Sequence, residues 1–217
     1  MDKKIKLQLA LDLDCIDRAL SIAEETKEFI DIIEIGTPLI KKYGIASVKK
    51  TRKIFNDAVL LADLKTMDGG IFEAELAFEA GADLTTVMAC ADYSTLQNVI
   101  DIARKNKKKI MIDMLGYQLG IKDFESKLAL LNYETDDIIL LTHLSFDKEK
   151  NITEAMIDLK LIQEINKFSH AVAGGIDLEV IKRIIDYEPS IIVVGSSITK
   201  ALNPLTVVKD FRNAISN

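Results

Sequence analysis

The sequence predicts an α/β protein, a single-domain (β/α)8 TIM barrel that takes up residues 1–217. Short apolar runs rich in Ile, Val and Leu alternate along the whole chain with longer stretches of helical spacing. The 217 residues divide over eight such units at roughly 27 residues each, which suits a compact barrel. No Ser-, Gly- or Pro-rich linker divides the chain, so we expect one domain.

The predicted strands are near-continuous apolar segments, as expected for a parallel sheet whose outer face is covered by helices. In chain order they are Ile5–Leu13, Ile30–Ile35, Ala58–Leu64, Leu84–Met88, Lys109–Met114, Asp137–His143, Ser169–Ala173 and Ser190–Val194. The clearest helical stretches are Ile71–Ala80, Ser94–Asn106, Glu154–Lys167 and Leu178–Tyr187. A doubly wound open sheet is the alternative, but the first strand–helix turn, Leu11-Asp12-Leu13-Asp14-Cys15, lacks a Gly-rich dinucleotide fingerprint.

Composition and charge exclude several classes of protein. The net charge of −6 argues against nucleic acid as a partner, because nucleic-acid binding needs a basic surface. No apolar run reaches about 18 residues and no apolar leader precedes the first strand, so neither a membrane span nor a signal peptide is expected. Cys15 and Cys90 lie far apart without metal-ligand spacing, and we expect buried or half-buried free thiols in a reducing cytoplasm.

Polar side chains interrupt the apolar runs near the carboxyl ends of the predicted strands, where barrels of this class place their active sites. They are Asp12, Glu34, Asp63, Lys65, Asp113 and His143. One such carboxylate alone is more often a helix cap or half of a structural ion pair. Four carboxylates, a lysine and a histidine at equivalent positions are costly to bury without a purpose, and they predict a site.

These residue types limit the chemistry of that site. Carboxylate oxygens suit Mg²⁺, with Mn²⁺ as the alternative, and the sequence has no His/Cys cluster for zinc. Lys65 follows Asp63 by two residues on the same strand face, so it should stay protonated and stabilise an oxyanion. His143 suits a proton carrier, although a histidine at a strand end is often a core residue. His170 begins the seventh strand at the opposite end and is predicted to be structural.

The last two units carry a phosphate signal. Gly174 and Gly175 follow the seventh strand, and Gly195 and Ser196 follow the eighth. Loops at these two places commonly hold a phosphate with backbone N–H groups. A tight turn explains a single Gly-Gly pair equally well, but two such loops in consecutive units favour a sugar phosphate as the ligand.

Five segments of the chain resemble a known enzyme family. They are Leu7–Asp12, Ile33–Ile40, Ala62–Asp68, Ala74–Asp83 and Ala173–Ile176. These segments look like those of the 3-hexulose-6-phosphate synthases and of their sister family, the 3-keto-L-gulonate-6-phosphate decarboxylases. Both sister families belong to the orotidine-monophosphate decarboxylase suprafamily, whose Asp-x-Lys-x-x-Asp motif is matched here by Asp63, Lys65 and Asp68. The resemblance extends over essentially the whole chain.

The resemblance implies a catalytic role for each matching residue. Glu34 and Asp63 would ligate Mg²⁺, which the oxygens of the substrate would also bind. Lys65 would hydrogen-bond an enediolate intermediate, and His143 would move protons.

The resemblance also implies a substrate pocket and a partner. Asp12 and Asp113 would line the sugar pocket, and the loops of Gly174, Gly175, Gly195 and Ser196 would hold the phosphate. Asp68 would reach across a homodimer interface and complete the site of the second subunit.

Several positions distinguish the two sister families. Phe146, Ser196 and Asp113 stand where the decarboxylase has Arg, Arg and Glu, and all three favour the synthase. Leu144-Ser145 and Ala89-Cys90 depart from the synthase pattern, which has Thr-Gly and Gly-Val there. The effect of these two departures on activity is left open.

The function expected from the resemblance is that of a lyase of carbohydrate metabolism. It would condense formaldehyde with D-ribulose 5-phosphate to D-arabino-hex-3-ulose 6-phosphate through a Mg-stabilised 1,2-enediolate, the formaldehyde-fixing step of the ribulose monophosphate pathway. The alternative is 3-keto-L-gulonate-6-phosphate decarboxylation to L-xylulose 5-phosphate and CO₂. A second alternative is a phosphosugar-binding barrel without turnover.

Overall fold

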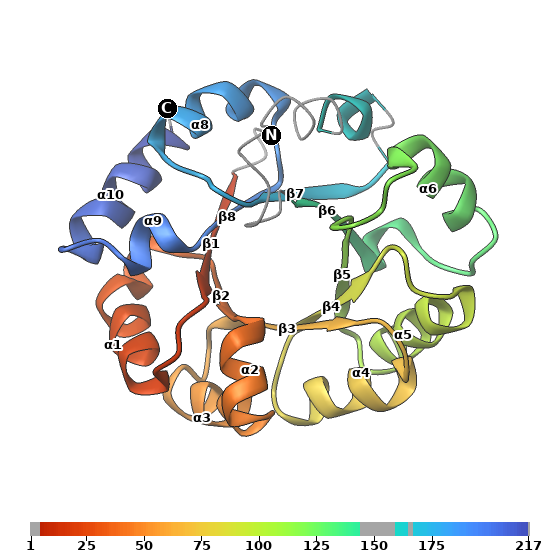
Figure 1. Ribbon diagram of the computed structural model, residues 1–217, viewed down its shortest axis with the longest axis horizontal. Helices are drawn as coiled ribbons and strands as arrows, with labels where there is room; N and C mark the ends of the chain where they lie inside the picture. The colour runs from red at the N-terminus through yellow and green to blue at the C-terminus, as the bar shows by residue number, and fades with distance from the viewer. Residues whose placement is uncertain (1–4, 144–158, 165–166, 217) are drawn as a thin grey trace.

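A computed structural model of the chain describes residues 5–143, 159–164 and 167–216, and these residues form a (β/α)8 barrel. All strands are parallel and hydrogen-bond in sequence order, and β1 pairs with β8 to close the sheet. Figure 1 shows the closed ring of strands with the helices outside it. The predicted fold class is therefore confirmed.

The strands coincide with the predicted apolar runs to within about two residues at each end. They are β1 (Lys6–Leu11), β2 (Ile32–Ile35), β3 (Val59–Thr66), β4 (Leu84–Met88), β5 (Lys109–Asp113), β6 (Ile138–His143), β7 (Ser169–Ala173) and β8 (Ile191–Val194). The strand β3 continues two residues past its predicted end at Leu64, so it includes Lys65 and Thr66. Its pairing register with β4 shifts between Ala62 and Thr66, and this irregularity lies at the site described below.

The helices occupy the outer ring. They are α1 (Ile16–Thr26), α2 (Thr37–Tyr43), α3 (Ala46–Ile54), α4 (Gly70–Glu79), α5 (Tyr93–Lys105), α6 (Gly120–Leu128), α8 (Leu178–Ile184), α9 (Ser196–Thr199) and α10 (Pro204–Ala214). Single 3-10 turns span Lys27–Phe29, Thr135–Asp137 and Ile185–Tyr187. The helices predicted over Ile71–Ala80, Ser94–Asn106 and Leu178–Tyr187 are present, the last with a 3-10 final turn. Most of the one predicted over Glu154–Lys167 lies outside the described residues, of which 159–164 are helical.

Side-chain caps define where several helices begin. The Asp92 carboxylate accepts a hydrogen bond from the Ser94 N–H before α5, and Asp177 accepts from two N–H groups of α8. Asn203 caps α10, whose first residue is Pro204. Each cap satisfies backbone donors that have no partner inside the helix, so the chain turns from loop to helix at these residues.

One apolar layer covers the outside of the sheet, and a second fills its inside. The larger lies between the strands and the helices and contains fully buried side chains such as Leu9, Leu60 and Phe211. A smaller layer fills the inside of the barrel, where inward-facing residues of neighbouring strands, including Leu61, Met111 and Ala171, pack together. The polar residues at the strand ends therefore lie above an apolar plug rather than along a channel. No helix in the described part of the chain is both long and apolar enough to cross a membrane.

The cysteines differ from the expectation in one respect. Cys15 and Cys90 are both free, as predicted, but both are exposed rather than buried. The reason is their position. Cys15 immediately precedes α1 and Cys90 lies in the β4–α5 loop, so neither belongs to an apolar run.

Candidate active site

A cavity of about 270 Å³ opens at the carboxyl ends of the strands. It is lined by the polar residues predicted from the strand ends together with both glycine loops, including Asp12, Glu34, Asp63, Lys65, His143, Gly174, Gly175, Gly195 and Ser196. The fold thus brings together residues from seven strands or the loops that follow them. Two predicted site residues are not part of the lining. Asp113 is fully buried in contact with Lys65 and His143, and Asp68 is exposed.

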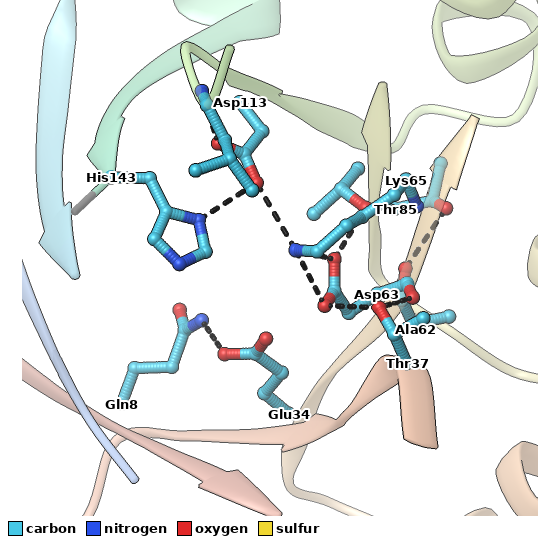
Figure 2. Close-up of polar contacts among 11 residues, drawn as sticks. Gln8, Glu34, Thr37, Ala62, Asp63, Lys65, Thr85, Asp113 and His143 are labelled. Atoms are coloured by element: carbon cyan, nitrogen blue, oxygen red, sulfur yellow. Dashed lines mark hydrogen bonds and ion pairs between the residues drawn. The ribbon is translucent and has the colours of Figure 1, made fainter. Parts of the chain in front are cut away.

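A row of interacting polar side chains runs from β6 through β5 to β3. Asp113 Oδ2 lies 2.9 Å from His143 Nδ1 and 3.1 Å from Lys65 Nζ. Lys65 Nζ continues the row to Asp63 Oδ2 at 2.9 Å. The other oxygen of Asp113 accepts a hydrogen bond from the Leu115 N–H at 2.9 Å. Figure 2 shows that Asp113 bridges the histidine and the lysine, so the carboxylate orients both.

The backbone of Lys65 adopts the left-handed conformation, with φ of 49°. Its N–H donates to Thr86 Oγ1 at 2.8 Å, and the Thr86 hydroxyl in turn donates to Asp63 Oδ1 at 2.8 Å. Simple strand alternation predicted that Asp63 and Lys65 share one face. They do converge, but through a β-bulge held by Thr86 rather than through a regular pleat.

Thr37, the first residue of α2, also holds Asp63. Its hydroxyl lies 2.7 Å from Asp63 Oδ2 and 2.9 Å from the Asp63 backbone oxygen. Neither Thr37 nor Thr86 was among the residues predicted from the sequence. The signal for Thr86 was a polar residue inside a buried strand, whereas nothing local marked Thr37.

Glu34 lies on β2, the strand next to β3, and pairs with Gln8. The Gln8 side-chain amide donates to Glu34 Oε2 at 2.7 Å, and both residues are buried. Burial raises the pKa of Glu34 well above its usual range, and the negative charges of Asp63 and Asp12 add to the effect. Gln8 was noted as facing inward with Asp12 but was not predicted as a site residue.

The remaining pKa shifts follow from the same balance of burial and charge. Burial raises the pKa of Asp12, and the nearby Asp63 raises it further. Burial alone would lower the pKa of Lys65, but the Asp63 and Asp113 carboxylates outweigh it and raise that pKa. Burial alone would raise the pKa of Asp113, yet its contacts with His143 and Lys65 lower it. Lys65 is therefore protonated, in agreement with the prediction.

The carboxylates at the mouth have the chemistry that suits a divalent cation, although no three His, Cys, Asp or Glu side chains of the described residues are already grouped around one point. Asp12, Glu34 and Asp63 line one mouth, Asp113 is buried against Lys65 and His143, and Lys65 is the permanent cation among the residues that line the mouth. Burial is the main cause that raises the pKa values of Asp12 and Glu34, and the neighbouring carboxylates add to the effect. Hard carboxylate oxygens are the ligands that Mg²⁺ and Mn²⁺ prefer. The residues present therefore suit the predicted metal.

The two glycine loops form the other side of the cavity. Gly174 and Gly175 have φ values of 96° and 62°, a conformation that side chains disfavour. The Ser197 hydroxyl donates to the Ile176 backbone oxygen at 2.7 Å and ties the two loops together. Gly195, by contrast, has room for a side chain, since an added Cβ would lie 3.5 Å from the nearest atom, the Ala10 oxygen.

A further glycine, Gly36, positions Asp12. A Cβ atom at Gly36 would collide with Asp12 Oδ1 and would lie only 2.9 Å from the Leu11 carbonyl oxygen. The turn between β2 and α2 therefore packs its bare backbone against the Asp12 carboxylate. This glycine was not predicted as a site residue.

The remaining positions singled out from the sequence lie outside the cavity or outside the described residues. His170 is buried at the start of β7, with Nε2 3.2 Å from the Tyr187 backbone oxygen, which agrees with a structural role. Asp68 accepts a hydrogen bond from the Gly69 N–H at 2.7 Å and lies outside the cavity. Leu144-Ser145 and Phe146 lie outside the described residues.

Comparison with known proteins gives a consistent result. Residues 5–211 match the orotidine 5′-phosphate decarboxylase/HUMPS family. The 3-hexulose-6-phosphate synthase of Bacillus subtilis (strain 168) is 35% identical over 214 residues, which cover 97% of this chain and 99% of the relative. A Staphylococcus aureus (strain bovine RF122 / ET3-1) protein with the same name is 33% identical over 212 residues, which cover 97% of this chain and 99% of the relative.

Solved structures agree with these matches. A crystal structure of 3-hexulose-6-phosphate synthase superposes with a TM-score of 0.87 at 30% identity, covering 97% of this chain and 99% of that one. The Salmonella typhimurium enzyme of that name has a TM-score of 0.84 at 31% identity, covering 98% and 99%. KGPDC from Streptococcus mutans has a TM-score of 0.86 at 23% identity, covering 98% and 97%, and shares the fold.

Proposed function

The chain belongs to the orotidine 5′-phosphate decarboxylase/HUMPS family, and from this premise we propose that it is a lyase of the 3-hexulose-6-phosphate synthase type. It condenses formaldehyde with D-ribulose 5-phosphate to D-arabino-hex-3-ulose 6-phosphate. The full-length relatives of that name support the assignment. The observation that carries it is the row His143–Asp113–Lys65 in one cavity with two glycine loops.

His143 is the base in this proposal. His143 Nδ1 lies 2.9 Å from Asp113 Oδ2. In this mechanism the imidazole donates its Nδ1 hydrogen to that carboxylate, which leaves the Nε2 lone pair free to take a proton. In Figure 2, Nε2 points away from Asp113 toward the side where Gln8 and Glu34 lie. His143 removes a proton from C1 of the ketose, and the C1–C2 enediolate results.

Lys65 stabilises the enediolate. Its ammonium group has three hydrogens and lies 3.1 and 2.9 Å from the two oxygens of Asp63 and 3.1 Å from Asp113 Oδ2. In this proposal one hydrogen is shared by the two Asp63 oxygens and a second is donated to Asp113. The third is available to the oxygen on C2, where negative charge develops as the proton leaves. A fixed cation at that place lowers the barrier more than it stabilises the neutral ketone.

Glu34 and Asp63 would hold the divalent cation, Mg²⁺ or Mn²⁺. When bound, it supplies a second positive charge that favours the ionised form of the substrate oxygens. Gln8 holds the Glu34 carboxylate, while Thr37 holds the carboxylate of Asp63. These contacts keep Glu34 Oε2 and Asp63 Oδ2 at the mouth of the barrel.

The remaining steps are binding of the phosphate and the sugar and formation of the new carbon–carbon bond. The backbone of Gly174, Gly175, Gly195 and Ser196 would receive the phosphate, and Asp12 would accept a hydrogen bond from a sugar hydroxyl. The C1 carbon of the enediolate attacks the carbonyl carbon of formaldehyde, a C–C bond forms, and the formaldehyde oxygen takes up a proton. The atoms of both substrates are all retained in the hexulose phosphate.

We also propose that the protein is a homodimer whose interface contains Asp68. Large apolar side chains are exposed beside it, on α4, at the start of α5 and just outside the two ends of α6. They are Met67, Ile71, Phe72, Tyr93, Leu119 and Leu130, and Phe72 is 70% exposed. An exposed apolar surface of this kind is typical of an interaction site. Asp68 would then complete the cavity of the second subunit.

The free, exposed thiols of Cys15 and Cys90 favour a reducing compartment, and we propose the cytoplasm.

One preparation assayed with two substrates tests the activity. We expect the protein to form hexulose phosphate from formaldehyde and D-ribulose 5-phosphate and to release little or no CO₂ from 3-keto-L-gulonate 6-phosphate. Exclusive CO₂ release would establish the sister activity. Tight binding of ribulose 5-phosphate without product or C1 proton exchange would show a binding protein.

A further inference from the structure

A second cavity, of about 460 Å³, lies at the other end of the barrel. Its lining consists of residues that begin strands or immediately precede them: Lys6, Ile32, Val59, Asp83, Leu84, Lys107, Lys108, Lys109, Ile139, Ser169, Ser190 and Ile191. The catalytic residues lie where the strands end, so the apolar plug of the barrel separates the two cavities. The proposed reaction uses none of these residues.

Four lysines line this amino-terminal cavity in a chain whose net charge is −6. Lys6 and Lys109 are the first residues of β1 and β5, which lie opposite each other in the ring. Both share the inward face of their strands, in line with Gln8 and Met111. The two lysines therefore belong to the same opening and come from opposite strands of the ring.

The one carboxylate in the lining is already engaged. Asp83 lies 2.6 Å from Lys108 Nζ and 2.5 Å from Arg52, and it also accepts a hydrogen bond from the Leu60 N–H. Lys6, Lys107 and Lys109 form no ion pair within the described ranges. The cavity thus keeps an excess of positive charge that its own carboxylate does not neutralise.

The backbone conformation of Lys107 is a further indication that positive charge is kept at this cavity. It has φ of 54° in the turn between α5 and β5, a position where glycine costs less. A lysine there places a third ammonium group at the rim of the cavity.

The interior of the cavity is apolar. Ile32, Leu84, Ile139 and Ile191 are buried inner-layer side chains that form its floor, and Ser169 and Ser190 add hydroxyl groups at the side. An inorganic ion alone would leave this floor uncovered. A ligand with an apolar body and an anionic head would bury the floor and meet the lysines at the rim.

We infer that this amino-terminal cavity binds a small organic anion with an apolar body, such as an aromatic or aliphatic sulfonate, carboxylate or phosphate ester. The apolar part of the ligand lies on the apolar floor of the cavity, and its anionic group lies between Lys6 and Lys109. This site is independent of the catalytic mouth.

The probe for the test is 8-anilinonaphthalene-1-sulfonate, titrated into isotope-labelled protein and followed by amide NMR spectra. We expect saturable shifts at Lys107, Lys109, Ser169 and Ser190, with a dissociation constant between about 0.01 and 1 mM. Lys109→Glu should weaken this binding by about three- to tenfold, because one attractive pair becomes a repulsive one.

Lys49→Glu is the matched control, since Lys49 is exposed on α3 and does not line the cavity. It carries the same charge change and should leave the titration unchanged. If Lys109→Glu does not fold, Lys109→Gln and Lys6→Gln replace it, with an expected loss of about two- to fivefold each. Shifts confined to Gly174, Gly195 and the exposed face of α4, or equal affinity in the lysine variants and the wild type, would overturn the inference.

Discussion

Replacing Asp113 with asparagine tests the row of interacting polar side chains most directly. Asp113 Oδ1 accepts from the Leu115 N–H, and Oδ2 contacts both His143 and Lys65. An asparagine that keeps the Leu115 hydrogen bond must place its NH₂ group where Oδ2 was. That NH₂ donates to His143 Nδ1, so the imidazole hydrogen moves to Nε2 and the lone pair needed for proton removal is lost.

The expected effect of Asp113→Asn is a fall of about 10²–10⁴-fold in exchange of the C1 proton of ribulose 5-phosphate with solvent deuterium, or roughly 3–5 kcal/mol of barrier. Two charge-assisted hydrogen bonds are lost, but a buried carboxylate no longer has to be desolvated. We therefore expect a net destabilisation of only about 1–3 kcal/mol. This lowers the melting temperature by about 2–4 °C per kcal/mol. NMR measures the exchange, and thermal unfolding measures the stability.

Two controls make the result specific. Asp83→Asn removes a paired carboxylate at the far end of the barrel, so it should cost stability without affecting exchange. His143→Asn should lose as much exchange as Asp113→Asn, and the double variant should lose little more, because the two residues act as a unit. Wild-type exchange in Asp113→Asn would show that Asp113 does not orient the base. Wild-type exchange in His143→Asn would show that another group is the base and that His143 is a structural histidine.

Three further predictions concern other parts of the molecule. Gly36→Ala should raise the KM for ribulose 5-phosphate by about tenfold or more in steady-state assays, because the added Cβ displaces Asp12; an unchanged KM would remove Asp12 from the sugar pocket. Gly175→Val should raise the same KM, since φ at this position is 62°, whereas Ser196→Ala should be mild; equal effects would move the phosphate elsewhere. Burial alone would raise the pKa of Asp83, but its hydrogen bonds and basic partners lower that pKa from 3.8. The ionised Asp83 carboxylate therefore stabilises the folded protein fully at neutral pH, and this stabilisation is lost as the pH falls through the pKa of the folded state. Urea unfolding at neutral and acidic pH should show the stability deficit of Asp83→Asn shrinking in acid, and a constant deficit would contradict this.

The fold was predictable because its signal is local. An apolar run of five or six residues followed by a helical stretch can be recognised without knowing what lies beside it. Repetition of that unit along the whole chain leaves few architectures that bury every strand on both faces. The strand ends were equally readable, since Asp12, Glu34, Asp63 and His143 each interrupt or end an apolar segment.

The contacts within the site were not predictable in the same way. Asp113 and His143 are 30 residues apart, and Thr37 and Asp63 are 26 apart, so only closure of the barrel brings each pair together. Thr37 opens an ordinary helix, and nothing in its neighbours marks it as a partner of a buried carboxylate.

The sequence by itself determined which residue types stand at which end of each strand, because alternation and apolar runs are properties of neighbouring residues. The tertiary structure decided how they meet. The left-handed bulge at Lys65 depends on the register between β3 and β4, and the lysines of the amino-terminal cavity share one opening only because β1 and β5 face each other across a closed ring. Register and closure are set by packing between segments distant in sequence, and no local pattern of residues encodes them.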